Sequence, residues 1–366
     1  MYKEIIQPVL NRCDSETFHD LARESLHVAE ISRFTLNILE YFNQKYARFT
    51  DERLHVDLGG IKLENPLIVG AGWDKAGRAM LGLWHLGFAS VEVGSVLEYG
   101  QPGNPKPRLF MVSDGAAVNW LGFNSPGLDI VARNLEKYKN TGIPVGISLG
   151  LNKDVAHDKA PDAYAAVTGT MYDYAAYYAI NISSPNTPGL RKLQNKERTV
   201  DIIRAVQAAM DDNGVRKPLF VKIAPDLTFD AIDDLISVAL DESVSGIIAC
   251  NTTNNADLKG KYGERWRKSP GGLSGDDPDY RKTTNDIITQ ICKTSGDKTH
   301  IVGVGGVKDA ETALEKIRAG ARALQLVTAI RGEGPAVAGK INRGIVEYME
   351  REGVSSLDEI LGAESK

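Results

Sequence analysis

The chain has few of the residues that build covalent or metal cross-links. Among its 366 residues are 3 cysteines, Cys13, Cys250 and Cys292, which are widely spaced and odd in number. Such a set predicts no disulfide framework and is typical of a reducing compartment. The 6 histidines show no metal-ligand spacing, so no metal site is expected.

Long apolar runs and blocks of one charge are also missing. No stretch approaches the roughly 20 apolar residues of a membrane-spanning helix, and the start lacks the basic-then-apolar layout of a secretory signal. The formal net charge is −5 without a basic block, so no nucleic-acid partner is expected. The composition, 42% hydrophobic and 25% charged, is that of a soluble globular protein. The length fits one large α/β barrel with an appendage, or two smaller domains.

Residues 1–50 contain no glycine and no strand-like run. Asp14 and Ser15 can cap a helix. Apolar residues then recur at helical spacing, at Ile31, Phe34, Ile38, Leu39, Phe42 and Tyr46. We expect two or three short amphipathic helices. Their apolar stripe either packs on the main domain or docks on a membrane surface and admits an apolar substrate.

From about residue 51 to 350 a short apolar run followed by a helical stretch repeats. Eight such units in series predict a closed (β/α)8 TIM barrel, and near-continuous apolar strands fit a parallel sheet covered on both faces. The expected strands are 67–69, 90–93, 144–147, 178–180, 219–222, 246–249, 301–304 and 324–327. The clearest expected helices are 128–138, 198–210, 231–240, 310–319 and 337–349.

Two further segments fall outside this repeat. The connection from Asn251 to Gly275 is long and charged, which is typical of a lid or a disordered loop. Residues 351–366 have the composition of a polar C-terminal tail.

The ends of the expected strands carry mostly uncharged polar residues. In barrels of this kind the carboxyl ends of the strands meet at one rim, where the chemistry takes place. Here that rim holds Lys75, Lys222 and several asparagines, with almost no carboxylates. Amides suit a planar ligand with alternating carbonyl and N–H groups, and suit metal-assisted hydrolysis poorly. The segment 181–191, read alone, is also compatible with an ordinary polar turn.

A phosphate site is indicated after the seventh and eighth strands. Gly303-Val304-Gly305-Gly306 and Thr328-Ala329 match the place where such barrels bind phosphate through backbone N–H groups. Lys222 lies inside the fifth strand, where a buried ammonium needs a partner, and an anionic cofactor would supply one.

Eight motifs follow one another in order along the chain, at 71–75, 101–110, 121–124, 181–191, 221–226, 251–253, 271–275 and 303–306. Together they resemble the dihydroorotate dehydrogenases, flavin enzymes of pyrimidine (UMP) synthesis, from the N-terminal helices to about Met349. A serine at Ser184 and the helical N-terminal region resemble the class 2, quinone-reducing branch.

The resemblance implies FMN as cofactor and dihydroorotate, oxidised to orotate, as substrate. The implied FMN-binding residues are Ala71, Gly72, Lys75, Ser95, Asn119, Ser148, Asn181, Lys222, Cys250, Gly275, Gly305, Gly306, Val327 and Thr328. The implied substrate-binding residues are Lys75, Asn119, Phe123, Asn181, Asn186, Asn251 and Thr252.

The resemblance also implies the roles in catalysis. Ser184 takes the proton from C5 while hydride leaves C6 for flavin N5, and Thr187 relays the proton to solvent. Phe123 and Lys75 complete the catalytic group, and Lys222 stabilises negative charge on the reduced flavin. A quinone then accepts the electrons at a site that includes His19, Met111 and Val327. The N-terminal helices would hold the protein peripherally on the cytoplasmic face of the cell membrane.

The chain departs from the family at several of these positions. Ser148, Leu151 and Cys250 stand where the family has asparagine, lysine and threonine. Near the quinone path, Met111 and Trp120 replace arginines and Val327 replaces a tyrosine, which removes donors for a quinone carbonyl.

These departures leave alternatives open. The acceptor is an atypical quinone or not a quinone, or the FMN barrel acts on another pyrimidine. A flavin-binding protein that no longer turns over and a flavin-free barrel lyase are less favoured, because Ser184, Lys75, Lys222 and the asparagines are all retained.

Overall fold

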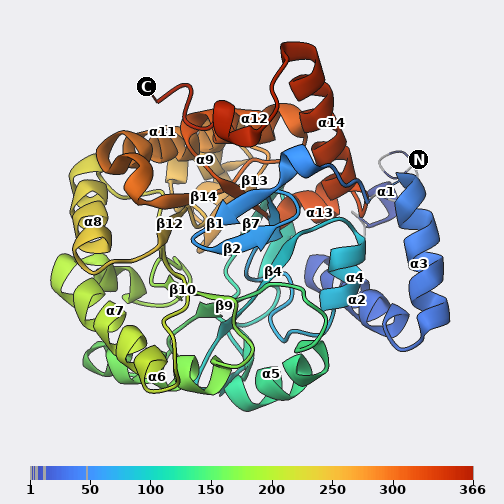
Figure 1. Ribbon diagram of the computed structural model, residues 1–366. Helices are drawn as coiled ribbons and strands as arrows, with labels where there is room; N and C mark the ends of the chain where they lie inside the picture. The colour runs from blue at the N-terminus through green and yellow to red at the C-terminus, as the bar shows by residue number, and fades with distance from the viewer. Residues whose placement is uncertain (1, 3, 5–6, 11–13, 47, 366) are drawn as a thin grey trace.

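A computed structural model shows a barrel with a small helical module at its side (Figure 1). It describes residues 2, 4, 7–10, 14–46 and 48–365. Cys13 and the side chains of Phe42 and Tyr46, which figured in the sequence analysis, lie outside the described part.

Eight parallel strands close into the predicted barrel, so the fold class is confirmed. In chain order each strand pairs with the next, and the last pairs with the first through Leu324 opposite Leu67. All eight expected runs are barrel strands. Their bounds are β3 Leu67–Val69, β4 Ser90–Val96, β9 Val145–Leu149, β10 Tyr177–Asn181, β11 Leu219–Ile223, β12 Gly246–Ala249, β14 His300–Val304 and β15 Ala323–Leu326.

Helices form the outer ring of the barrel (Figure 1). All five helices named in the sequence analysis are present, with α12 at the predicted bounds and the others shifted by up to three residues at either end. Capping explains where some begin, since Asp309 and Thr312 form a capping box at α12 and Asp277 accepts the Tyr280 N–H at α11. The ring comprises α4 Met80–His85, α5 Leu128–Leu135, α6 Ala160–Met171, α7 Lys196–Asp211, α8 Phe229–Asp241, α11 Pro278–Ser295, α12 Ala310–Ala319 and α14 Val337–Glu352. The short helix α13 Thr328–Gly332 lies instead at the carboxyl end of the barrel, where it borders the cavity.

Short antiparallel pieces cover the two ends of the barrel. The hairpin of β1 (Val56–Leu58) and β2 (Ile61–Leu63) lies over the amino ends of the strands, where Gly59 packs near Ser245 and His300. At the other end are β5 Tyr99–Gln101 paired with β8 Ser125–Gly127, and the sheet of β6 Leu109–Met111, β7 Ala116–Asn119 and β13 Gly272–Gly275. Single 3-10 turns lie at 52–54, 136–138, 157–159, 190–194, 296–298 and 357–359.

The charged connection after β12 is ordered, although disorder was one expectation. It contains α9 (Ala256–Gly260) and α10 (Glu264–Arg267). Trp266 and Leu273 form a second small core with Ala116 and Val118, and buried Lys259 donates to two backbone carbonyls. This satellite core, which the charged composition conceals, holds the segment in place.

The carboxyl-terminal residues are not simply a solvated polar tail. Leu357 and Ile360 are buried, and the N–H groups of Gly362 and Glu364 donate to carbonyls at the end of α12. The buried side chains and these hydrogen bonds together dock the segment against the barrel helices.

The N-terminal module consists of the expected helices, α1 Gln7–Leu10, α2 Ser15–Ala29 and α3 Arg33–Tyr46. They lie together at one side of the barrel, beside α4 (Figure 1). Their exposed large apolar side chains are Leu21, Val28, Ile31, Phe34, Ile38 and Tyr41.

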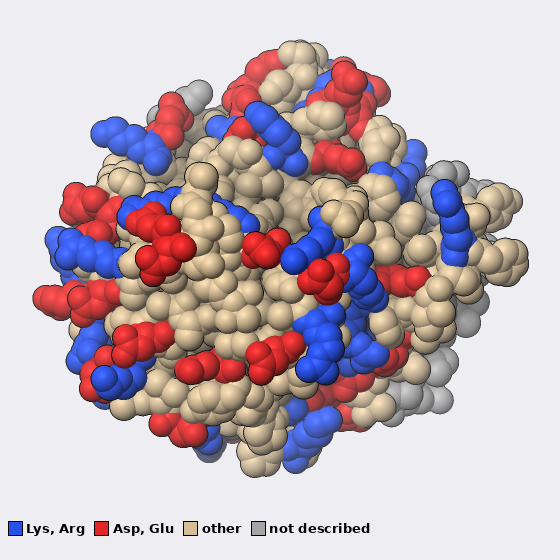
Figure 2. Space-filling view, turned by 60° about the horizontal axis from the view of Figure 1, so that its bottom comes forward, with Lys and Arg blue, Asp and Glu red and all other residues tan. Residues whose placement is uncertain are grey.

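The charged surface is mixed. Lys and Arg lie among Asp and Glu over the face in Figure 2. Within the described residues, no helix is long and apolar enough to cross a membrane and no cluster of His, Cys, Asp and Glu could hold a metal ion.

Candidate functional site

One large cavity opens at the carboxyl ends of the barrel strands, with helix α2 along its border. It encloses about 1580 Å³, its open mouth included. The sequence-predicted residues that line it are His19, Ala71, Gly72, Lys75, Ser95, Met111, Asn119, Phe123, Asn181, Ser184, Asn186, Lys222, Cys250, Asn251, Thr252, Gly275, Gly305, Gly306, Val327 and Thr328. The predicted residues Ser148 and Thr187 are buried behind the wall.

A chain of polar side chains joins the ends of four strands. Ser148 and Ser95 hydroxyls lie 2.9 Å apart, and Asn181 Nδ2 donates to Ser95 Oγ at 2.9 Å. Asn251 Nδ2 in turn donates to Asn181 Oδ1 at 3.2 Å and to Ser183 Oγ at 3.0 Å. Each amide is therefore held in one orientation by its neighbours. Ser148 supports Ser95 instead of facing the cavity.

Beside this chain, several buried polar atoms have no partner within the described protein. Asn186 Nδ2 donates to Asn119 Oδ1 at 3.2 Å, but Asn186 Oδ1 has no hydrogen-bond partner. The same holds for Thr252 Oγ1, which lines the same cavity, and for Thr187 Oγ1 behind it. Unsatisfied buried polar atoms are rare in folded proteins, so their presence here marks a place where a polar ligand fits.

The loop that carries Ser184 is fixed by Arg191. Arg191 Nε donates to Ser183 O at 3.0 Å and its Nη2 to Thr252 O at 3.0 Å, while its Nη1 pairs with Asp226 at 2.7 Å. One guanidinium thereby ties together the loops after β10, β11 and β12. Ser184 Oγ accepts the N–H of Asn186 at 3.2 Å.

Two ammonium groups reach the cavity from different strands. Burial lowers the pKa of Lys75 to about 8. Neighbouring Asp74 is fully buried, accepts the N–H groups of Arg78 and Ala79 at 2.8 Å, and has a pKa raised by burial. Lys222 Nζ donates to Gln325 Oε1 at 3.0 Å. The site is therefore cationic and rich in amides, as the sequence indicated.

Cys250 is fully buried in the wall of this cavity and has a neutral thiol. Burial raises its pKa to about 12, far above the range in which a thiolate forms at neutral pH. Reactive-cysteine chemistry is thus disfavoured at this position.

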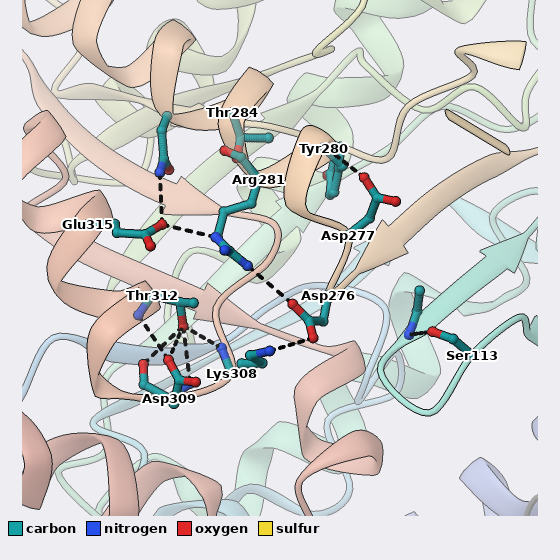
Figure 3. A network of polar contacts seen from close by, with 12 residues as sticks. Ser113, Asp276, Asp277, Tyr280, Arg281, Thr284, Lys308, Asp309, Thr312 and Glu315 are labelled. Atoms are coloured by element: carbon teal, nitrogen blue, oxygen red, sulfur yellow. Dashed lines mark hydrogen bonds and ion pairs between the residues drawn. The ribbon is translucent and has the colours of Figure 1, made fainter. Parts of the chain in front are cut away.

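The glycine loops after β13 and β14 are packed from behind. Gly275, Gly305 and Gly306 all have positive φ, and a Cβ added at Gly306 would lie 2.7 Å from Arg281 Cβ. A charge network supports these loops: Asp276 accepts from Arg281 at 3.2 Å and Lys308 at 2.6 Å, and Arg281 also pairs with Glu315 at 2.9 Å (Figure 3). The loops are thereby held beside the Thr328 turn with which they line the cavity.

The mouth of the cavity is closed on one side by a buried ion pair. Arg108 forms three hydrogen bonds to Glu16: its Nε donates at 3.2 and 3.0 Å and its Nη2 at 2.7 Å. The pair joins α2 to the residue that precedes strand β6. Burial acts to raise the pKa of Glu16, but the hydrogen bonds and charge of Arg108 outweigh it and lower the pKa. Met111 and Val327 line the same cavity.

His19 of α2 is held in one tautomer. Its Nε2 lies 2.7 Å from Trp73 O, so the neutral ring donates from that nitrogen. Burial, and then the nearby Lys75 ammonium, lower the pKa of His19 to about 3.

The sequence analysis did not single out several residues that the fold brings here. Gln325, Tyr280, Ser274 and Arg331 also line the cavity, and Arg191 and Glu92 act behind it. Glu92 had a sequence signal, because a carboxylate interrupts an otherwise apolar strand. Arg191 had no such sequence signal, because its contacts depend on loops that are far apart in the sequence.

Comparison with known proteins agrees with this geometry. A sequence profile described as dihydroorotate dehydrogenase matches residues 53–349. A protein named dihydroorotate dehydrogenase (quinone) from Natronomonas pharaonis is 40% identical over 364 residues, 99% of each chain. The chain belongs to the dihydroorotate dehydrogenase family.

Further members place it in the class 2 branch of that family. A namesake from Rhizobium johnstonii is 42% identical over 315 residues, 85% of each chain, and one from Myxococcus xanthus is 35% identical over 363 residues, 99% of this chain and 98% of its own. The crystal structure of the Eimeria tenella family member in complex with ferulenol superimposes with a TM-score of 0.85, at 29% identity, over 97% of each chain.

We predict that His19 makes stability depend on mild acid. The folded protein keeps this ring neutral while the unfolded chain protonates it below pH 6.5, so stability falls as pH drops from about 6.5 towards 3. The loss due to one such group is up to about 1.4 kcal/mol per pH unit. Urea denaturation between pH 7 and 4.5 should therefore show a shallower decline for His19→Gln. The exposed His55 offers a control, since His55→Gln should follow wild type. Parallel curves for wild type and His19→Gln would contradict the assignment.

Proposed function

We propose that the protein oxidises dihydroorotate to orotate in pyrimidine synthesis, using FMN and passing the electrons to a quinone-type acceptor. The observation that carries this proposal is the convergence of Ser184, the amide chain and two lysines on one cavity. It is supported by family membership over nearly the whole chain.

The residues present fit FMN. The positive-φ glycines 275, 305 and 306 and the Thr328 turn suit a phosphate, which backbone N–H groups bind well. Lys222 is 5% exposed and Gln325 takes one of its three N–H donors, so donors remain for an anionic ring system. When bound, FMN supplies the two-electron acceptor that takes hydride from the substrate and releases electrons to the second acceptor.

The proposed substrate-binding groups include polar atoms whose hydrogen-bonding capacity is not used within the described protein. Asn186 Oδ1 and Thr252 Oγ1 can pair with the N–H groups and carbonyls of the pyrimidine, which would satisfy both buried atoms. Lys75 would bind the carboxylate, and Asn119, Asn181 and Asn251 the remaining edges. Phe123, with φ of 52°, places its ring in the same cavity wall.

Ser184 is the proposed base. Its Oγ is fixed by the Asn186 N–H and by Arg191 holding the carbonyl of Ser183. A serine hydroxyl is a weak base, so positive charge nearby must stabilise the negative charge that develops on the substrate carbonyl. Thr187 Oγ1 is buried and has no hydrogen-bond partner among the residues that the structure describes, so it suits the relay that carries the proton outward.

Anaerobic mixing with dihydroorotate tests the reaction and the base together. We expect the flavin absorbance of the wild type to bleach, and Ser184→Ala to bleach at least about 100-fold more slowly, the lower end for general base catalysis. The flavin content should be unchanged. Ser90→Ala, which removes a hydroxyl bonded to Pro144 O at the far end of the barrel, is the control. A wild-type rate in Ser184→Ala would refute the base, and an oxidised wild type in excess dihydroorotate would refute the reaction.

The acceptor is proposed to be an atypical, more apolar quinone. Met111 and Val327 line the cavity where the family has an arginine and a tyrosine, so two donors for a quinone carbonyl are replaced by apolar surface. Neutral His19 donates its Nε2 proton to Trp73 O and does not offer it to the acceptor.

Restoring the family residues should therefore change acceptor preference. We expect slow turnover with short-chain ubiquinone analogues in the wild type, and a several-fold higher kcat/KM in the double variant Met111→Arg, Val327→Tyr. Reduction of the flavin by dihydroorotate should be the same in both proteins. Rapid ubiquinone turnover by the wild type would contradict this view of the acceptor.

The N-terminal helices are proposed to dock on the cytoplasmic face of the cell membrane. Ile31, in the turn before α3, and Phe34, in the first turn of α3, are 73% and 72% exposed, so two large apolar side chains lie close together on the surface of the module. An apolar acceptor dissolved in the bilayer would enter between these helices.

Sedimentation with lipid vesicles tests this docking. The double variant Ile31→Glu, Phe34→Glu should lose most vesicle binding, because two charges would have to enter the interface. Val215→Glu changes an equally exposed apolar residue, 81% exposed, outside the module and should bind like wild type. Equal losses in both variants, or no binding by wild type, would argue against docking through α3.

A further inference from the structure

Lys222 and three other polar side chains fill one layer of the barrel interior. Glu92, Tyr177, Lys222 and Gln325 come from β4, β10, β11 and β15 and are 0%, 1%, 5% and 2% exposed. Barrels of this type are normally filled at this level by branched apolar residues. The layer therefore requires an explanation beyond packing.

The layer has a defined order of contacts. Gln325 Nε2 donates to Glu92 Oε2 at 2.6 Å, and Gln325 Oε1 accepts from Lys222 Nζ at 3.0 Å. Tyr177 OH adds a second hydrogen bond to Glu92 Oε2 at 3.2 Å. Lys222 Nζ lies 3.8 Å from Glu92 Oε1, which has no hydrogen-bond partner within the described residues. The amide thus stands between carboxylate and ammonium and holds them apart.

Two glycines make room for this arrangement. Glu92 and Tyr177 both lie opposite Gly146 in the strand register, and a Cβ on Gly146 would lie 2.2 Å from Tyr177 Cζ. The tyrosine reaches Glu92 across the bare backbone of β9. A Cβ on Gly70 would lie 3.3 Å from Gln325 Oε1.

Such a layer is energetically unfavourable compared with apolar packing. Removing a carboxylate and an ammonium from water costs several kcal/mol per ion, and a close pair regains part of this only when its geometry is good. Here the two charges are held beyond hydrogen-bond distance by Gln325. Lys222 keeps its place in the cavity wall instead of closing on Glu92.

We propose that Glu92, through Gln325, is a positioning residue that sets how strongly Lys222 stabilises negative charge in the cavity. This inference rests on the proposed function, in which FMN binds beside Lys222. Uptake of two electrons and one proton adds a negative charge to the isoalloxazine, which the ammonium attracts and the Glu92 carboxylate behind it repels. Glu92 therefore lowers the reduction potential of the bound cofactor, which favours passing electrons on to the second acceptor.

The test is a spectroelectrochemical titration of the FMN-loaded protein. Glu92→Gln removes the charge and keeps the shape, so we expect the equilibrium between oxidised and reduced FMN to shift at least tenfold toward reduced. That shift equals about 30 mV for a two-electron couple. Tyr177→Phe removes one hydrogen bond to Glu92 but no charge, and should stay within twofold of wild type.

A second variant should shift the equilibrium between oxidised and reduced FMN in the opposite direction. Gln325→Leu keeps both charges but removes the amide between them, so Lys222 should close on Glu92 and the equilibrium should shift at least threefold toward oxidised FMN. This variant also serves if circular dichroism shows that Glu92→Gln does not fold.

The possible outcomes distinguish failure of the proposed function from failure of the role assigned to Glu92. A wild-type protein that binds no FMN would overturn the proposed function and this inference with it. FMN bound normally in all variants, with Glu92→Gln or Gln325→Leu within twofold of wild type, would overturn the inference alone. Opposite shifts in the two variants, with Tyr177→Phe unchanged, would support it.

Discussion

The site depends on the closure of the parallel sheet. Once β15 pairs with β3, eight strand ends point to one rim, and residues as distant in sequence as Lys75 and Thr328 line one cavity. Closure alone does not orient the side chains, however. Loops that leave different strands are fixed to one another by buried polar groups, among which Arg191 joins three loops at once. Barrel geometry sets the place, and these cross-loop contacts set the orientation.

Much of this could be predicted because its signals are local. A strand such as Gly246–Ala249 is apolar and is followed closely by polar residues. Helix α12 begins at a capping box whose two residues, Asp309 and Thr312, are three positions apart. The side chains that line the cavity are mostly those at strand ends, and their motifs resemble a known family. Periodicity and motif therefore identified the fold and most of the candidate site.

The features that could not be predicted from the sequence depend on contacts between segments that are distant in the chain. Ser148 turned out to support Ser95 from behind the wall, and nothing near either residue predicts their 2.9 Å separation. The ordered segment after β12 depends on Trp266 meeting Ala116 and Val118 of another hairpin. The docked carboxyl end depends on where α12 finishes. In each case a partner more than forty residues away decides the outcome.

The ion pair between Glu16 and Arg108 has a consequence for how the cavity mouth can evolve. Both side chains are buried, and breaking such a pair by removing one partner costs roughly 3–5 kcal/mol. The exposed Lys106, 3.4 Å from Glu16, would compensate only in part for the loss of Arg108. Single substitutions at either residue are therefore disfavoured, because only a simultaneous change of both would avoid this loss of stability. Met111 and Val327, which line the same cavity and have apolar side chains that need no hydrogen-bond partner, can change one at a time. The lining at such positions can therefore vary while the anchor of α2 stays constant.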